Sequence, residues 1–492
     1  MSLINVMNLS FAYDGAPDMV FDNVSFQIDT DWKLGFTGRN GRGKTTFLNL
    51  LRGKYEYSGV IYSSVSFEYF PYEVNDKENY TINVIKNISP DCMDWEIYRE
   101  LSFLEVNDDV LYRPFSTLSN GEQTKVLLAA LFLKQNSFLL IDEPTNHLDE
   151  KAREVVGNYL NRKKGFILVS HDRVLLDICV DHILSINRAD IEIQKGNFSS
   201  WWENKQSQDN FELSHNEKLK KDISRLSAAA KRNAAWSDKV ESSKHGTKNS
   251  GLKLDKGYVG HKSAKMMKRS KSIEARQRAA FEEKSKLLHN VELDEELSIF
   301  PLIHHNDRLI ELNNVSLFYE DKEICNNISF SINQGERVAI CGKNGCGKSS
   351  IIKLICGEDI LYQGELHRAS GLKISYVSQD TSCLHGTLSE YAKSLCIDES
   401  VFKSILRKMD FKRTQFEKDI ADYSEGQKKK VLIAGSLCEN AHLYIWDEPL
   451  NFIDIISRMQ IEKLILSYKP TLLFVEHDIA FVKNIATQFI TI

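Results

Sequence analysis

The sequence predicts an α/β protein with two tandem P-loop nucleotide-binding domains joined by an antiparallel α-helical hairpin. First, a phosphate-binding loop of the form G-x-x-x-x-G-K-[ST] occurs at residues 38–45 and again at 342–349. Second, further paired motifs keep nearly the same offset, between 304 and 306 residues. Third, residues 145–300 contain none of the eight prolines. A constant offset indicates duplication of a whole domain, because chance matches would not keep register.

Each phosphate loop follows an apolar segment, 34–37 or 338–341, that is typical of a buried parallel strand. The loop glycines let successive N–H groups point into one concavity, the lysine reaches the outer phosphates, and the following hydroxyl ligates Mg²⁺. A helix that starts behind the loop adds its positive dipole end. The predicted nucleotide-binding residues are Gly38, Arg39, Asn40, Gly41, Arg42, Gly43, Lys44, Thr45 and Thr46 in the first repeat, and Gly342, Lys343, Asn344, Gly345, Cys346, Gly347, Lys348, Ser349 and Ser350 in the second.

The stretch between the repeats predicts two helices, 204–242 and 261–291, with a glycine-containing loop at 244–260. Apolar residues there recur at helical spacing, and no glycine occurs between residues 197 and 245. We therefore expect domains at 1–203 and 294–492, with a linker at 204–293. Residues 204–290 carry 21 Lys or Arg against 10 Asp or Glu, whereas the rest of the chain carries 42 against 58. A basic projecting hairpin favours an RNA partner, although a solvated coiled coil is the ordinary explanation of such charge.

Acidic pairs close a predicted strand in each repeat. Asp142 and Asp447 are expected to ligate Mg²⁺, with Thr45 and Ser349, while Glu143 and Glu448 polarise the attacking water. A single pair of this kind is as often a buried structural acid, but the repeated order of motifs favours catalysis. The histidines that follow the next strand, His171 and His477, are expected to reach the phosphate; either one alone would be an ordinary histidine.

A third paired motif, L-S-N-G-E at 118–122 and Y-S-E-G-Q at 423–427, completes a recognisable order. The chain contains the same order of motifs twice: a phosphate loop, a signature, a strand that ends in D-E-P, and a histidine. This order resembles that of the nucleotide-binding domains of the ABC superfamily. The resemblance implies ABC-type domains forming an intramolecular ATP sandwich in a monomer, in which each signature completes the other domain's site. The residues that it assigns to ATP in addition to the loops are Ser119, Gly121 and Glu122, Ser424, Gly426 and Gln427, and the tyrosines Tyr13 and Tyr319, which would stack on adenine or simply pack against their strands.

Two such domains on one chain with a basic helical linker resemble the ABC-F family of ribosome-binding translation ATPases. The segments 256–262, 264–271 and 446–451 resemble the Lsa and Vga type of antibiotic-resistance member. This implies a protein that protects the bacterial 70S ribosome from lincosamides, pleuromutilins and streptogramin A by binding the E site. It would lie next to 23S rRNA and the P-site tRNA. The linker residues expected to approach the drug site are Leu252, Lys253, Leu254, Lys256 and Tyr258.

The repeats also differ from each other. Gln379 stands where the family ties nucleotide and Mg²⁺ to domain motion, whereas the first repeat has Tyr72 at that place. The segments after the D-E-P motifs differ as well, so we expect two unequal ATP sites. Cys346 puts a thiol in the second loop, where a thiol reagent would block phosphate entry; alternatively it is a small residue at a tolerant position.

Bulk properties exclude several classes of protein. No apolar run reaches the roughly 20 residues needed to cross a bilayer. The start lacks a signal-peptide pattern, and nine scattered cysteines without C-x-x-C predict a reducing cytoplasm. The alternatives are a housekeeping translation factor of the same family that relieves stalled ribosomes, the ATPase subunit of an efflux transporter, which would need a membrane partner, and a chromosome ATPase, which normally has a longer arm or zinc cysteines.

Overall fold

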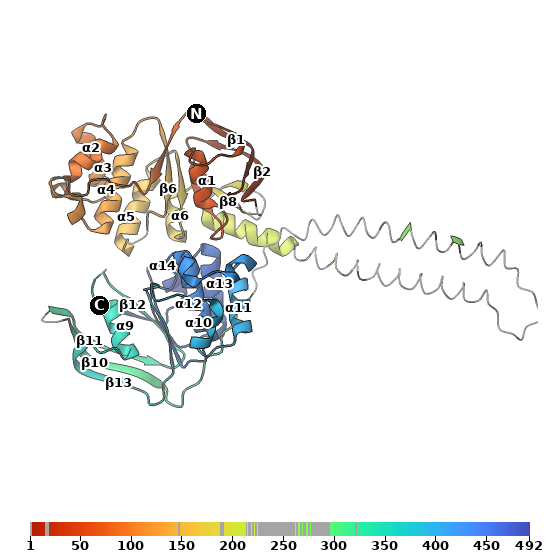
Figure 1. Ribbon diagram of the computed structural model, residues 1–492. Coiled ribbons are helices and arrows are strands. Elements are labelled where there is room, and N and C mark those ends of the chain that lie inside the picture. Colours follow the sequence, from red (N-terminus) through yellow and green to blue (C-terminus); the bar gives the residue numbers. More distant parts are fainter. Residues whose placement is uncertain are drawn as a thin grey trace, which may run out of the picture. The chain divides into compact units, whose positions relative to one another are not determined.

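The computed structural model describes residues 2–14, 19–145, 148–186, 191–212, 296–319, 322–343 and 345–492, with scattered positions between 214 and 276 (Figure 1). The chain divides into two units: Met1–Trp201 with Asp294–Ile492, and Trp202–Leu293. Both repeats lie in the first unit. The described positions of the second unit, among them Lys218 and Lys265, are helical. The predicted tip residues and most of the predicted hairpin lie outside the described residues, so the linker and the domain boundaries stay predictions. The tip residues are Leu252, Lys253, Leu254, Lys256 and Tyr258.

The first repeat contains a six-stranded sheet, and all of its neighbouring strands run parallel except the last pair. Its order is β5 (Ser66–Phe70), β6 (Ser137–Asp142), β7 (Phe166–Val169), β3 (Lys33–Thr37), β8 (His182–Ile186) and β9 (Ile191–Lys195). The helices are α1 (Lys44–Leu51), α2 (Thr81–Ile88), α3 (Asp94–Phe103), α4 (Asn120–Phe132), α5 (Glu150–Asn161) and α6 (Arg173–Cys179). A separate antiparallel sheet has the order β2 (Phe21–Asp29), β1 (Leu3–Phe11) and β4 (Ser58–Tyr62).

The second repeat has the same plan with an all-parallel five-stranded sheet. Its order is β14 (Ile374–Val377), β15 (Leu443–Asp447), β16 (Leu472–Val475), β12 (Arg337–Cys341) and β17 (Gln488–Thr491). The helices are α9 (Lys348–Cys356), α10 (Leu388–Ser394), α11 (Glu399–Lys408), α12 (Glu425–Cys438), α13 (Ile455–Tyr468) and α14 (Ile479–Ile485). Its antiparallel sheet has the order β11 (Lys322–Asn333), β10 (Arg308–Tyr319) and β13 (Leu361–Arg368). The predicted α/β fold of tandem nucleotide-binding domains is confirmed.

Short 3₁₀ turns complete both repeats. In the first they span Asp108–Tyr112 and Phe115–Thr117, and in the second Arg413–Glu417 and Ile420–Asp422. Each second turn leads directly into a signature motif, so it sets where the helix after that motif begins.

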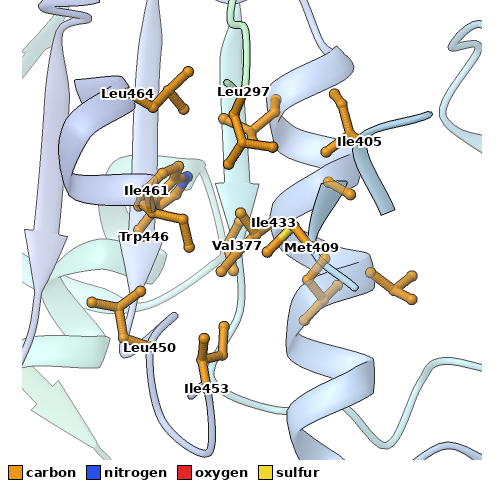
Figure 2. Packing of buried hydrophobic residues seen from close by; sticks show 14 of the residues in the cluster. Leu297, Val377, Ile405, Met409, Ile433, Trp446, Leu450, Ile453, Ile461 and Leu464 are labelled. Carbon is orange, nitrogen blue, oxygen red and sulfur yellow. The ribbon is translucent and has the colours of Figure 1, made fainter. Parts of the chain in front are cut away.

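A fully buried core holds the site-bearing end of β15. Trp446 is 1% exposed and, as Figure 2 shows, packs among residues from several elements, including Val377 of β14 and Ile461 of α13. Its indole Nε1 donates a hydrogen bond to Ser436 Oγ at 3.1 Å, which satisfies the one polar atom that the ring buries. Because Asp447 is the next residue, this packing fixes the position of its carboxylate.

Candidate functional site

Both phosphate loops require glycine directly before their lysine. Gly43 and Gly347 have φ of 95° and 96°, in the left-handed region that side-chain-bearing residues rarely adopt. A Cβ at Gly43 would also lie 2.5 Å from Val20 Cγ1 and one at Gly347 2.8 Å from Ile324 Cγ2. The α1 and α9 helices begin at the next residue, so their N-termini open at the loop and favour an anion there.

The loop lysines fold over their own loops. Lys44 Nζ donates to the Gly38 carbonyl at 2.7 Å and to Asn40 Oδ1 at 3.2 Å. Lys348 Nζ donates to the carbonyl oxygens of Gly342 and Lys343, both at 2.9 Å. Both ammonium groups are therefore held above the concavity that a phosphate would fill. The predicted site residue Asn344 lies outside the described residues.

The predicted Mg²⁺ ligands come together at the ends of β6 and β15. Thr45 Oγ1 donates to Asp142 Oδ2 at 3.1 Å, and Ser349 hydrogen-bonds Asp447. Burial raises the pKa of both carboxyls, and Asp447 Oδ1 is buried without a hydrogen-bond partner. Hydroxyl and carboxylate oxygens are ligands that Mg²⁺ prefers. A bound cation would also stabilise the charged form of these buried carboxylates, so the residues fit the ion.

Each predicted glutamate lies next to its predicted histidine. The distance from His171 Nε2 to Glu143 Oε1 is 3.3 Å, and that from His477 Nε2 to Glu448 Oε1 is 3.2 Å. Both glutamates have positive φ, 49° and 47°, a conformation that costs energy in a non-glycine residue and is found at functional sites.

The two glutamates nevertheless differ in their electrostatic surroundings. Burial, and then the charge of Asp142, raises the pKa of Glu143 to about 8. Burial would also raise the pKa of Glu448, but the hydrogen bond and charge of His477, with the nearby lysines, hold it below its usual value. Glu448 Oε2 also accepts hydrogen bonds from Gln379 Nε2 at 2.9 Å and Asn451 Nδ2 at 2.7 Å. Near neutral pH the second site therefore holds an ionised base and the first a largely protonated one.

A tyrosine that the sequence analysis did not single out reaches the first Mg²⁺ position. Tyr69, at the end of β5, donates its hydroxyl hydrogen bond to Asp142 Oδ2 at 3.0 Å. Tyr72, on which the sequence argument focused, is 37% exposed. The signal that could have found Tyr69 is its match to Tyr376, since both tyrosines sit on the strand that pairs with the acidic strand.

The signature motifs are helix N-caps. Ser119 Oγ accepts a hydrogen bond from the N–H of Glu122 at 3.3 Å, and Glu122 Oε2 accepts one from the N–H of Ser119 at 2.9 Å. Ser424 and Gln427 form the same capping box, at 3.4 and 3.0 Å. The S-x-G-E/Q spelling thus has a local structural cause, and it places the N-termini of α4 and α12 as anion-binding ends.

One composite site is an open cavity between a signature and the opposite phosphate loop. The cavity has a volume of about 1050 Å³. It unites the first signature with the second loop, and its predicted site residues are Ser119, Gly121, Glu122, Lys343, Gly345, Gly347, Lys348, Ser349, Ser350, Gln379, Glu448 and His477. The structure therefore brings Lys348 and Ser119 to one site.

The other composite site is closed by direct contacts. Asn40 Nδ2 donates to the Phe452 carbonyl at 2.7 Å, and one nitrogen of Arg42 bonds both carboxylate oxygens of Asp410, at 3.0 and 2.9 Å. A Cβ at Gly426 would lie 2.4 Å from that same carbonyl oxygen. The second loop has Cys346 at the position that matches Arg42, and a cysteine side chain cannot form this ion pair. Asp410 was not predictable from the sequence, since nothing in the local pattern marks a residue that acts across the repeats.

The predicted adenine-stacking tyrosines are both accessible. Tyr13 is 45% exposed, and its hydroxyl lies 2.6 Å from Thr46 Oγ1 while its ring packs against Phe11. Tyr319, at the end of β10, is 48% exposed. Each side chain is thus about half exposed, and the adenine role of both tyrosines stays a prediction.

Within the described ranges, no helix has both the length and the apolar character needed to cross a membrane. In the same ranges no group of three or more His, Cys, Asp or Glu side chains forms a metal-binding cluster.

Comparison with known families gives matches in both repeats. The family described as ABC transporter matches residues 21–146 and 325–451, just over half of the chain. Among curated relatives, the ATP-binding protein Uup of Buchnera aphidicola is 28% identical over 99% of this chain and 80% of its own length. The ribosome protection protein VmlR of Bacillus subtilis is 27% identical over 98% and 85%, and the ABC transporter F family member 2 of Arabidopsis thaliana is 26% identical over 99% and 76%.

Solved structures show the same fold. The archaeal ribosome recycling factor aABCE1, solved in complex with the ribosomal stalk protein aP1, aligns with a TM-score of 0.64 at 17% identity, over 98% of this chain and 87% of that one. The RNase-L inhibitor aligns with a TM-score of 0.61 at 17% identity, over 99% and 87%.

Proposed function

The chain belongs to the ABC transporter family, and from that premise we propose that it is an F-type ATPase that binds the bacterial ribosome and protects it from peptidyl-transferase-centre antibiotics. The observation that carries the ATPase part is the 1050 Å³ cavity, in which Lys348 and Ser349 of one repeat face Ser119 of the other. An ATP held between two repeats links its binding to their closure. Such a device converts nucleotide binding into a change of domain geometry.

The residues of each repeat divide the work of hydrolysis. The phosphate loop and its lysine hold the triphosphate, and the N-terminus of the opposite signature helix stabilises the transferring phosphoryl group. Ser349 and Asp447 would hold Mg²⁺, which when bound would neutralise charge on the phosphate oxygens. Glu448, kept ionised beside His477, orients and polarises the attacking water. Gln379 and Asn451 fix its carboxylate through its second oxygen.

The ribosomal part of the proposal rests on the relatives and on charge. VmlR, similar over nearly the whole chain, is named as a ribosome protection protein. The excess of Lys and Arg between residues 204 and 290 supplies the positive charge that polyanionic rRNA would attract. We propose that closure docks the protein at the E site and brings the linker tip toward the drug site, next to the P-site tRNA. The antibiotics against which we propose that it protects are lincosamides, pleuromutilins and streptogramin A. We also propose that the protein acts as a monomer in the cytoplasm.

Replacing Glu143 and Glu448 together by Gln tests the coupling to ATP. The double variant should sediment with 70S ribosomes only when ATP is present, because hydrolysis no longer releases it. Sedimentation that does not depend on ATP would count against the scheme. The Lys348→Ala variant serves as a control that lowers nucleotide binding while leaving the linker intact.

Translation in vitro with lincomycin tests protection itself. Purified protein with ATP should restore synthesis, and protein without ATP should not. Restored synthesis on stalled ribosomes without any effect on drug inhibition would instead favour the housekeeping factor. Unchanged accumulation of labelled drug in protected cells would eliminate efflux.

A further inference from the structure

Two thiols line one small cavity beside the second phosphate loop. The cavity has a volume of about 490 Å³, and its walls include Cys325 of β11, Cys346 of the loop, and the chain end at Ile490 to Ile492. Both cysteines are free, and Cys325 is 8% exposed. This cavity shares one lining residue, Ile324 of β11, with the ATP cavity, and the second phosphate loop contributes different residues to each.

Both cysteines pack against glycines of the second phosphate loop and line the same cavity. A Cβ added to Gly347, the residue after Cys346, would lie 3.4 Å from Cys325 Sγ and 3.7 Å from its Cβ. A Cβ added to Gly342 would lie 2.7 Å from Cys346 Sγ, so the Cys346 side chain folds back over the first residue of the loop. Burial raises the pKa of Cys325, and the neighbouring Cys346 sulfur adds to that rise.

The first repeat has the same backbone arrangement without the thiols. A Cβ added to Gly43 would lie 3.1 Å from the ring of Phe21, which takes the place of Cys325. Arg42 takes the place of Cys346 and bonds Asp410. Thiol chemistry at a phosphate loop is therefore confined to the second repeat among the parts that the structure describes.

We propose that Cys325 and Cys346 are a redox-sensitive pair that closes into a disulfide and shuts the second ATP site when low-molecular-weight disulfides accumulate. The thiolate of Cys346 attacks a small disulfide, forming a mixed disulfide and expelling one small thiol. Cys325 then attacks the Cys346 sulfur and expels the second small thiol. The two protein thiols lose two electrons and two protons, and the small disulfide gains them, so the step is balanced and reversed by excess thiol.

The bond would close the site through the position of the loop backbone. A disulfide requires Cα atoms within about 7 Å and a fixed Cβ geometry, so closing it draws Cys346 toward β11. That shift moves loop N–H groups away from the concavity that holds phosphate. Bound nucleotide fixes the same N–H groups, so ATP must slow formation of the bond by the reciprocity of linkage. The proposal rests on the second loop binding ATP, as proposed above, and is independent of the ribosome.

The experiment incubates the full-length protein with oxidised glutathione, with and without Mg-ATP. Alkylation and peptide mass mapping score the Cys325–Cys346 bond, and filtration measures ATP bound per chain before and after dithiothreitol. Binding should fall by about half, because one of two loops is affected, and dithiothreitol should restore it. The Cys325→Ser variant, which keeps Cys346 but lacks its partner, should bind ATP normally in reductant and yield no such bond. Cys383→Ser, which removes an exposed thiol elsewhere, should behave as the wild type.

The outcomes separate this proposal from the function on which it rests. Failure of the bond to form in nucleotide-free protein, or bond formation that leaves ATP binding unchanged, would overturn the redox pair. Equal rates of bond formation with and without Mg-ATP would overturn the loop mechanism. Reduced protein that binds no ATP would instead refute the proposed ATPase, and with it the blocking step, whereas mapping would still score the bond.

Discussion

Single substitutions at the two glutamates should give different pH profiles of ATP hydrolysis, one rising with pH and one nearly flat. With a pKa near 8, Glu143 is roughly one-tenth ionised at pH 7 and about one-hundredth at pH 6, whereas Glu448 is already ionised. An acid whose pKa is raised loses its basic form as pH falls. In Glu448→Gln, where only the first site keeps its base, turnover should therefore rise with pH between pH 6 and pH 8, by at most about fiftyfold, because Mg²⁺ bound at Asp142 would offset the part of the pKa rise that the Asp142 charge causes. In Glu143→Gln it should stay nearly flat.

Phosphate release at saturating Mg-ATP measures both profiles, and the double Gln variant supplies the baseline. At pH 7 we expect Glu448→Gln to lose most of the activity, because a positioned general base contributes on the order of 10²- to 10⁴-fold. Glu143→Gln should lose little, since the amide resembles the protonated acid that is already there. Parallel pH profiles, or a larger loss at Glu143, would refute the assignment of unequal bases.

Three further predictions concern stability and closure. A double-mutant cycle with Arg42→Ala and Asp410→Ala should give a coupling free energy of about 1.5–3 kcal/mol in denaturant unfolding, because the side chains are only 13% and 17% exposed; a value near zero would show that the pair is broken in solution. Gly426→Ala should lower the unfolding free energy by about 1–3 kcal/mol, because its Cβ would lie 2.4 Å from a carbonyl oxygen, whereas the matched Gly121→Ala, with 3.5 Å to its nearest side chain, should cost little; equal losses would contradict the tight packing. Trp446→Ala should cost about 3–5 kcal/mol in calorimetric unfolding, and a loss below 1 kcal/mol would mean that this core is not formed.

Much of the fold and of the site was predictable from local pattern. The strands that end in Asp142 and Asp447 can be recognised in the sequence as apolar runs followed by acidic residues. Parallel neighbouring strands bring their carboxyl ends to the same edge of a sheet. That geometry is why each glutamate meets the histidine after the next strand. Family membership is confirmed, while the Lsa and Vga type, the drug spectrum and the roles of the linker stay predictions.

The contacts that distinguish the two sites were not predictable from pattern. Tyr69 reaches Asp142 because its strand pairs with β6, and a pleat decides which of two adjacent aromatic residues points there. The Arg42–Asp410 pair joins residues 368 positions apart, from two repeats whose meeting is set by tertiary packing. The expectation of unequal sites, argued from Tyr72, stays a prediction, and the structure adds two differences to it: the contact of Tyr69 with Asp142 and the different electrostatic surroundings of Glu143 and Glu448.

The ion pair at only one of the two phosphate loops has a consequence for nucleotide exchange. A ligand at the first loop leaves only after the two hydrogen bonds from one Arg42 nitrogen to Asp410 have been broken, whereas the second loop, with Cys346 at the matching position, opens onto a cavity without this ion pair. The two triphosphates should consequently have different residence times on the same chain, with one retained over several turnovers of the other. A single molecule would then retain the ATP of the first site while the second site continues to bind and release nucleotide.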